Sequence, residues 1–202
     1  GPVPLAVKGG NRMEEKRIVV AATGASGMPL LLSCLKKIRQ TPGFTSCLIL
    51  SDSARLTLQH ETAYTPEEIM AWTDEVFAPN QIGAGPASGT YETAGMLIVP
   101  CSMKTVAGIH SGYAENLILR AADVTIKEQR PLVLAVRETP LSAIHLRNMQ
   151  ELAMLPGVRI IPPMMTFYQL PATIQDMVDH LAAKLVEPFG IKSETFRRWK
   201  GL

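Results

Sequence analysis

Met96–Val99 (Met-Leu-Ile-Val) runs directly into Pro100–Thr105 (Pro-Cys-Ser-Met-Lys-Thr), and this junction decides the fold. A short apolar run of this kind is typical of a strand buried on both faces of a parallel sheet. A turn of small and hydroxyl-bearing residues after such a strand favours phosphate binding. Four charged side chains follow in a chain with only 19% charged residues: Arg120, Lys127, Arg137 and Glu138. Cations among apolar segments indicate that an anion is bound there.

The same alternation of apolar runs and helical segments continues on both sides of this junction. We expect strands at 18–22, 47–50, 96–99, 132–136 and 158–161. We expect helices at 30–38, 54–60, 66–72, 103–110, 115–122, 141–154 and 173–186. The third helix opens with a capping box at Thr65–Glu68. Buried strands separated by helices predict a parallel sheet covered on both faces, which is a single-domain three-layer α/β/α fold.

Length and residue usage exclude several classes of protein. At 202 residues the chain is long enough for one domain with a full core. A net charge of +2 gives no electrostatic reason to expect a nucleic-acid or membrane partner. The three cysteines are widely spaced and odd in number, which is typical of a reduced, cytoplasmic protein. The four histidines show no ligand spacing, so we expect no metal site.

The beginning of the chain differs from the rest. Residues 1–12 show no periodic pattern, and Met13 is a plausible native start. We expect residues 1–16 to be either a leftover of cloning or a disordered lead. The folded domain would then span residues 17–202. No internal repeat or second domain boundary interrupts that range.

Four polar loops follow predicted strands, at 23–27, 51–53, 100–105 and 137–140. Parallel sheets bind ligands beyond the carboxyl ends of their strands, so these loops are expected to converge. The first either presents amides and a hydroxyl to a phosphate or is a tight turn. Ser51 and Asp52 either contact a ribityl or ribose hydroxyl or cap the next helix. A further loop, Pro86–Gly89, is either a phosphate contact or a simple turn.

Several segments occur in the order and near the spacing of one known family. They are Thr23–Gly27, Pro100–Thr105, Arg120–Val124, Arg130–Leu134, Arg137–Ser142, Ile144–Leu146 and Phe167-Tyr168. On these segments, residues 17–201 resemble the UbiX/Pad family of flavin prenyltransferases. Glu61–Thr65 and Arg197–Leu202 are most similar to the branch that forms the B component of hydroxyarylic (phenolic) acid decarboxylase systems.

The resemblance implies a flavodoxin-like, Rossmann-like enzyme that needs no metal. It implies a homo-oligomer, typically a dodecamer, with active sites between subunits. The implied reaction joins a dimethylallyl group from dimethylallyl phosphate, the monophosphate by analogy, to N5 and C6 of reduced FMN. The product, prenylated FMN, would serve a separate UbiD-type decarboxylase in aromatic acid metabolism.

The resemblance also implies roles for residues at matching positions. Ser26 and Glu61 match the pair that orients the flavin N5 edge and relays protons, and Glu138 matches the proton-transfer carboxylate. FMN binding falls to Gly24, Ala25, Ser26, Ser51, Ser102, Met103, Lys104, Thr105 and Arg137. The donor's phosphate and allyl group fall to Arg120, Lys127, Tyr168, Lys184 and Trp199, with Arg137 beside them. Fixed cations suit this reaction because the departing phosphate carries negative charge. Lys184 stands where the family usually has arginine, so it offers a point charge rather than a fork.

Three other functions fit parts of the sequence. A short-chain NAD-type oxidoreductase fits the 23–27 loop and Asp52, but the chain has neither G-x-G-x-x-G spacing nor a Tyr-x-x-x-Lys pair. A flavin-dependent cysteine decarboxylase would share the fold and the FMN, but its Asn-containing substrate loop and a well-placed catalytic histidine are missing. A non-catalytic FMN delivery subunit would use the same pocket. Glu61, Glu138 and the set of cations favour catalysis over delivery.

Overall fold

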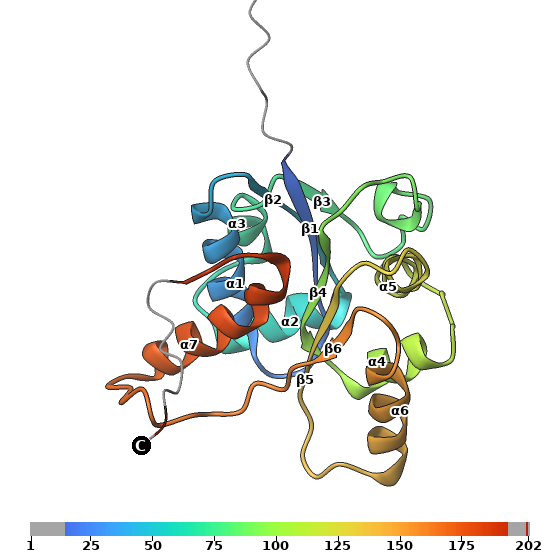
Figure 1. Cartoon of the computed structure of the whole chain (residues 1–202). Coiled ribbons are helices and arrows are strands. Elements are labelled where there is room, and N and C mark those ends of the chain that lie inside the picture. The colour runs from blue at the N-terminus through green and yellow to red at the C-terminus, as the bar shows by residue number, and fades with distance from the viewer. Residues whose placement is uncertain (1–14, 194–200, 202) are drawn as a thin grey trace, which may run out of the picture.

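The computed structural model describes residues 15–193 and 201. They form one parallel sheet of six strands in the order β3-β2-β1-β4-β5-β6 (Figure 1). The strands are β1 Lys16–Ala22, β2 Phe44–Leu50, β3 Glu75–Phe77, β4 Gly95–Cys101, β5 Leu132–Val136 and β6 Val158–Ile160. The predicted parallel α/β fold is therefore confirmed.

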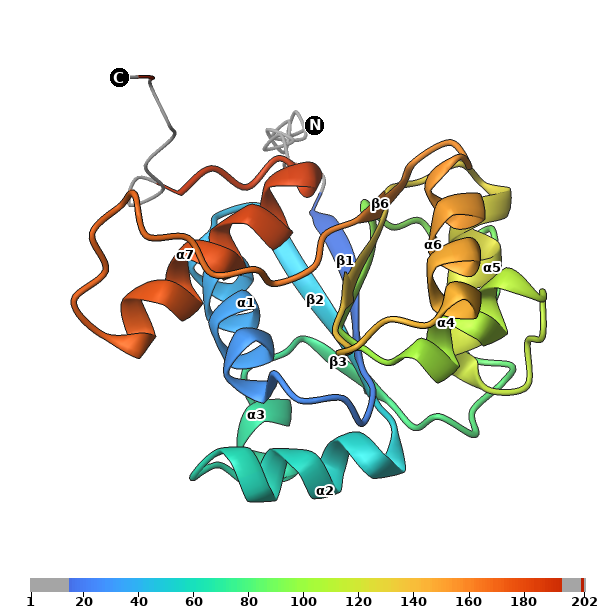
Figure 2. The ribbon, with the colours of Figure 1, turned by 90° about the horizontal axis from the view of Figure 1, so that it is seen from below.

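Helices cover both faces of the sheet, which makes three layers (Figure 2). One face carries α1 Met28–Gln40, α2 Asp52–Glu61, α3 Pro66–Met70 and α7 Ile174–Val186. The other face carries α4 Met103–His110, α5 Leu117–Lys127 and α6 Ala143–Ala153. Short 3₁₀ turns lie at Gly85–Ala87 and Glu187–Phe189. None of the described helices is long and apolar enough to cross a bilayer.

The core is split in two by the sheet, because successive side chains of a strand point to opposite faces. In β1, Ile18, Val20 and Ala22 pack beneath α1 and α7, whereas Val19 and Ala21 pack beneath α4 and α5. All seven residues of β4 are buried, as the apolar run at 96–99 predicts for a central strand. This double burial fixes the position of the loop that follows β4.

Several elements differ from the sequence prediction, most clearly β3, β4 and α5. β3 was not predicted, because an edge strand of three half-exposed residues has no apolar run. β4 continues through Pro100 to Cys101, which pairs with Val136 after a shift in register. The helix predicted at 115–122 instead runs from Leu117 to Lys127. Its second half keeps helical spacing, with Val124 and Thr125 buried between exposed Asp123 and Lys127, so the sequence prediction ended this helix too early.

The strand order reverses between β1 and β4, and this point is where sheets of this topology bind ligands. The loops after β1, β2, β4 and β5 all lie at the carboxyl edge of the sheet, the lower edge in Figure 1. The convergence expected of these loops is thus present in the fold.

Candidate active site

Hydrogen bonds of Thr23 join the loops after β1 and β4. Its backbone N–H and its hydroxyl both donate to the carbonyl of Pro100, at 3.2 and 3.0 Å. The same hydroxyl oxygen accepts from the N–H of Ser102 at 2.9 Å. Thr23 is only 6% exposed, so these bonds hold the two loops in fixed positions. The geometry at the strand-order reversal is therefore rigid before any ligand arrives.

Two helices begin beside this junction, and each is capped by a serine. The Ser51 hydroxyl accepts from the N–H of Ala54 at 3.0 Å and caps α2, which confirms the capping role, while its contact with a ligand stays a prediction. The Ser102 hydroxyl accepts from the N–H of Thr105 at 3.2 Å and caps α4. Helix N-termini carry partial positive charge and suit a phosphate group.

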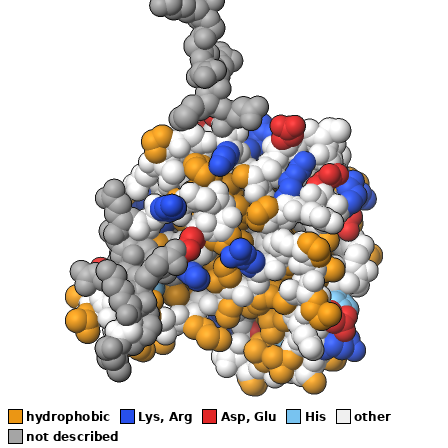
Figure 3. Space-filling model, viewed as in Figure 1, with side chains coloured by type: hydrophobic (Ala, Val, Ile, Leu, Met, Phe, Trp, Pro, Cys, Tyr) orange, Lys and Arg blue, Asp and Glu red, His pale blue; other side chains and the backbone are white. Residues whose placement is uncertain are grey.

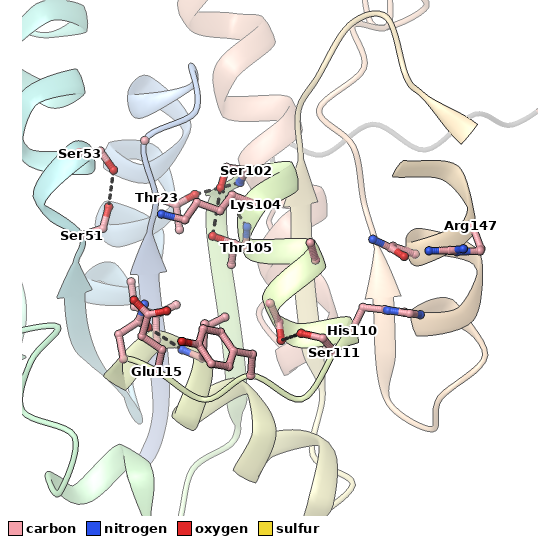
Figure 4. A pocket seen from close by; sticks show the side chains of 18 residues that line it. Thr23, Ser51, Ser53, Ser102, Lys104, Thr105, His110, Ser111, Glu115 and Arg147 are labelled. Carbon is pink, nitrogen blue, oxygen red and sulfur yellow. Dashed lines mark hydrogen bonds between the residues drawn. The ribbon is translucent and has the colours of Figure 1, made fainter. Parts of the chain in front are cut away.

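A cavity of about 540 Å³ opens between these helix starts (Figure 4). Five of the residues predicted to bind FMN line it: Gly24, Ser51, Ser102, Lys104 and Thr105. Gly24 is needed for close approach, because a Cβ there would lie 2.7 Å from the Ser53 side chain. Hydroxyls, a lysine and helix N-termini in one cavity fit a ligand with a phosphate and a hydroxyl-bearing chain, as FMN has.

Thr23 and Ser53 also line this cavity and were not predicted. Both stand in loops that the sequence marked, at 23–27 and 51–53, so the position of the loop was the available signal. Met103 was predicted to contact FMN, but its side chain is 8% exposed and packs in the core beneath α4. Met103 does not line this cavity, but it does line a groove beside Glu138, so its contact with FMN stays a prediction.

Ser26 and Glu61 come together although they are 35 positions apart in sequence. The Ser26 hydroxyl donates to Oε2 of Glu61 at 3.0 Å. The N–H of Gly27 donates to both carboxylate oxygens, at 2.9 and 3.2 Å. The turn after β1 therefore fixes a carboxylate from the last residue of α2 against an exposed serine hydroxyl.

Arg137 and Glu138 follow β5, and both side chains are exposed. The N–H of Arg137 donates to the carbonyl of Cys101 at 3.3 Å, which places the pair beside the loop after β4. Glu138 accepts a hydrogen bond from the N–H of Thr139 at 2.9 Å. It stands at the edge of an apolar groove of about 390 Å³ that Met103, Leu146 and Met164 help to line.

Tyr168 and Lys184 line a separate cavity of about 250 Å³, between α7 and the segment after β6. Pro162, Met164 and His180 also line it. Pro162 and Met164 are shared with the groove beside Glu138, so the two hollows are neighbours. Two of the predicted donor-binding residues are thus brought together, near the predicted proton-transfer carboxylate.

Arg120 and Lys127 line none of these hollows, and Lys127 lies apart from them within one copy of the chain. Both belong to α5, and Lys127 is its last residue, at the edge of the sheet where the strands begin. A side-chain carbon on Gly89 would lie 3.5 Å from Nζ of Lys127, so the 86–89 loop is also at that edge. Nε of Arg120 is buried without a hydrogen-bond partner. Trp199 lies outside the described residues.

Comparison with known proteins places the chain in a family. The model of the Flavoprotein family matches residues 8–187. Flavin prenyltransferase LpdB of Lactiplantibacillus plantarum is 50% identical over 186 residues, which cover 92% of this chain and 99% of that protein.

Two solved structures are also similar. A dodecameric FMN-dependent UbiX-like decarboxylase from Escherichia coli O157:H7 is 43% identical, with a TM-score of 0.89 over 92% of this chain and 100% of that one. AnUbiX (PadA1), in complex with FMN and dimethylallyl pyrophosphate, is 42% identical, with a TM-score of 0.89 over 93% and 99%. The chain therefore belongs to the Flavoprotein family and, within it, to the UbiX-like flavin prenyltransferases.

Proposed function

We propose that the protein transfers a dimethylallyl group from dimethylallyl phosphate to N5 and C6 of reduced FMN, and so makes prenylated FMN. The observation that carries this proposal is the 540 Å³ cavity at the β1–β4 junction, with helix N-termini and hydroxyls for a phosphate and a ribityl chain. Membership of the flavin prenyltransferase family supports the same reaction.

The residues have separate tasks in this proposal. Gly24, Ser51, Ser102, Lys104 and Thr105 line the cavity and hold FMN. Ala25, Ser26, Met103 and Arg137 contact it from outside this lining. Reduced FMN supplies the two nucleophilic atoms that take the prenyl group. Glu61 keeps the Ser26 hydroxyl directed and accepts protons through it. Glu138 transfers a proton on the phosphate side, where cations stabilise the departing negative charge.

The donor phosphate is bound, in our proposal, by residues from more than one copy of the chain. Lys127 and Arg137 flank β5 at its two ends, and five residues of strand alone span about 16 Å. One phosphate cannot contact residues at both ends of the same strand. Nε of Arg120 is buried without a hydrogen-bond partner among the described residues. A buried donor of this kind is costly to leave unpaired, so we propose that a bound anion or a second copy of the chain accepts from it.

An apolar face supports assembly with further copies. Figure 3 shows hydrophobic side chains gathered over α6, β6 and the segment after β6. Large exposed ones in this part of the chain include Leu141, Ile144, Leu146, Met154, Met164, Met165 and Phe167. Apolar patches of this kind mark interaction surfaces. We propose that copies of the chain cover this face in a homo-oligomer, as in the dodecameric relative.

The proposal also covers the enzyme that receives prenylated FMN and the cellular compartment of the protein. We propose that a UbiD-type decarboxylase receives prenylated FMN, and that the chain is the B component of such a phenolic acid decarboxylase system. A reducing cytoplasm suits the three cysteines, which are all buried and free. Burial raises the pKa of Cys34 and of Cys47 to about 12, so these thiols stay protonated and unreactive.

The test is an anaerobic incubation with reduced FMN and dimethylallyl monophosphate, with the diphosphate in parallel, followed by mass analysis of the flavin. We expect a flavin heavier by one prenyl unit, formed without added metal. Tightly bound but unchanged flavin would instead support FMN delivery to a decarboxylase. Failure to bind FMN at all would contradict both.

A further inference from the structure

His180 and Lys184 stand one turn apart on α7 and both line the 250 Å³ cavity that Tyr168 faces. Side chains four positions apart on a helix share one face. Tyr168 comes from the segment that connects β6 to α7, in orange in Figure 1. Helix α7 packs along α1, where the Ser33 hydroxyl donates to Asp179 at 2.7 Å. His180 therefore belongs to a fixed wall of the cavity.

His180 contacts Tyr168 in two ways. Its Nε2 lies 3.4 Å from the phenolic oxygen. The two rings meet edge to face, with centroids 5.7 Å apart and an angle of 81° between their planes. His180 is 9% exposed whereas Tyr168 is 43% exposed, so the buried imidazole is the fixed partner and the phenol is the accessible one.

The imidazole is neutral at pH 7, because burial lowers the pKa of His180 below its ordinary value. A neutral imidazole has one nitrogen that donates and one that accepts. A phosphate group offers only acceptors at its ionised oxygens, so a phenol beside it uses its single proton to donate to the phosphate. The phenolic oxygen must then accept from Nε2–H of His180.

We propose that His180 is a positioning residue of the prenyl-donor site, whose Nε2–H holds the phenolic oxygen of Tyr168 so that its proton points at the donor phosphate beside Lys184. This inference rests on the proposed function. Lys184 presents a compact charge on a flexible stem and gives no fixed direction to a hydrogen bond. Of Tyr168 and Lys184, the phenol is therefore the group that gives the phosphate a directed hydrogen bond, and His180 sets that direction.

A double-mutant cycle tests this role in the full-length protein. His180→Phe keeps a ring but removes the donor, His180→Gln keeps an N–H donor, and Tyr168→Phe removes the phenolic oxygen. For each variant and for the His180→Phe/Tyr168→Phe pair, two quantities are measured: KM and kcat with dimethylallyl monophosphate, and its Kd by calorimetry. FMN affinity and the thermal midpoint serve as controls, because the FMN cavity has no residue in common with this one.

We expect H180F to raise KM and Kd for the donor about three- to tenfold, with kcat changed less and FMN affinity unchanged. H180Q should restore most of the loss. In the Y168F background, H180F should add less than about twofold, because the group it positions is gone. An equal loss in both backgrounds, or an H180Q variant as weak as H180F, would overturn the positioning role.

Measuring donor binding (Kd) as well as turnover (KM and kcat) separates this inference from the proposed function. A wild-type protein that binds dimethylallyl monophosphate but transfers nothing would contradict the function, and the Kd cycle would still decide the role of His180. A wild-type protein that does not bind the donor would overturn both. If H180F fails to fold, His180→Leu takes its place in the cycle, with the same expected result.

Discussion

At the turn after β1, a single carboxylate organises the proposed proton relay. Glu61 accepts three hydrogen bonds, two from the N–H of Gly27 and one from the Ser26 hydroxyl. This arrangement leaves the serine proton directed at Glu61 and the serine oxygen exposed to a ligand. These hydrogen bonds all come from residues 26 and 27, so the Ser26–Glu61 pair is held in place by the turn after β1 alone.

Glu61→Gln should slow prenyl transfer by about 100-fold or more, because a neutral amide is a poor proton acceptor. FMN affinity should change little, since Glu61 does not line the FMN cavity. The measurement is the rate at which the flavin gains mass, with FMN titrations beside it. Ser26→Ala should slow the same step or stop it after the first bond forms. Turnover at the wild-type rate in both variants would remove the pair from the mechanism.

Glu138→Gln should leave FMN bound but slow transfer, also by about 100-fold, since it removes the carboxylate proposed for proton transfer on the phosphate side. Its side chain is exposed, and its hydrogen bond comes from the neighbouring Thr139 N–H, so the fold should not change. Flavin binding and transfer are measured on the same preparation. Loss of both together would make Glu138 a structural residue instead.

Sequence predicted most of these residues through the loops that carry them. Ser26 lies in the loop after β1 and Glu61 is the last residue of α2, and only the resemblance paired them before the structure showed their contact. Thr23 was missed because its role, joining two strands at the sheet's switch point, depends on a strand order that a sequence does not display. The sequence did not single out His180, because a lone histidine on an amphipathic helix is usually a buried residue of the core.

Helix α7 shows what one element contributes to the site. Its first turn is closed by a capping box in which the Thr173 hydroxyl accepts from the N–H of Asp176 at 3.1 Å, and Asp176 accepts from the N–H of Thr173 at 3.1 Å. This start sets the register of the helix, and with it the positions of His180 and Lys184. The sequence predicted this helix within one residue, since its apolar period is regular.

Thr173→Ala should lower the free energy of unfolding by about 1 kcal/mol, because the N–H of Asp176 loses its acceptor. Urea denaturation at one fixed protein concentration measures the change, since assembly also contributes to stability. Thr173→Ser keeps the hydroxyl and should restore most of the loss. A Ser variant as unstable as the Ala variant would show that the methyl group's packing, not the cap, matters.

The same helix makes stability depend on pH. The folded pKa of His180 lies below its ordinary value of 6.5 because of burial. As pH falls through 6.5, the unfolded chain gains a proton that the folded chain does not, so stability decreases until the folded pKa is passed. Urea midpoints between about pH 8 and about pH 5 should therefore fall more steeply for wild type than for His180→Gln. If the urea midpoints of wild type and His180→Gln fell equally with pH, the lowered pKa of His180 would be contradicted.

The features that the sequence did not predict are those that depend on neighbouring elements. β3 forms because Glu75–Phe77 can pair with Cys47–Ile49, and nothing in its own three residues announces a strand. Only the resemblance placed Met103 at the ligand; α4 begins at this residue and its side chain packs in the core, so the contact with FMN stays a prediction. Helix and strand periodicity thus predicted the central elements of the sheet and its helices. The edge strand and the direction of individual side chains could be seen only in the three-dimensional structure.

Within the whole molecule, one copy of the chain separates the groups that we propose for the reaction. The FMN cavity, the Ser26–Glu61 pair and Glu138 lie at the carboxyl edge of the sheet, whereas Lys127 and the 86–89 loop lie at the other edge. The sequence resemblance suggested which residues bind the donor phosphate, but not which copy of the chain supplies each of them to a given site. We therefore expect prenyl transfer to occur at a site that two or more copies share.

Coexpression of Lys127→Ala and Arg137→Ala chains, each with its own purification tag, distinguishes a shared site from one built by a single copy. Each variant alone should transfer the prenyl group at least about 100-fold more slowly than wild type, because a phosphate-binding cation is missing from every site. In mixed oligomers, a site that takes Lys127 from one copy and Arg137 from another is intact about one time in four. Prenylated FMN formed at about a quarter of the wild-type rate is the predicted result. Mixed oligomers no faster than either variant alone would contradict a shared site.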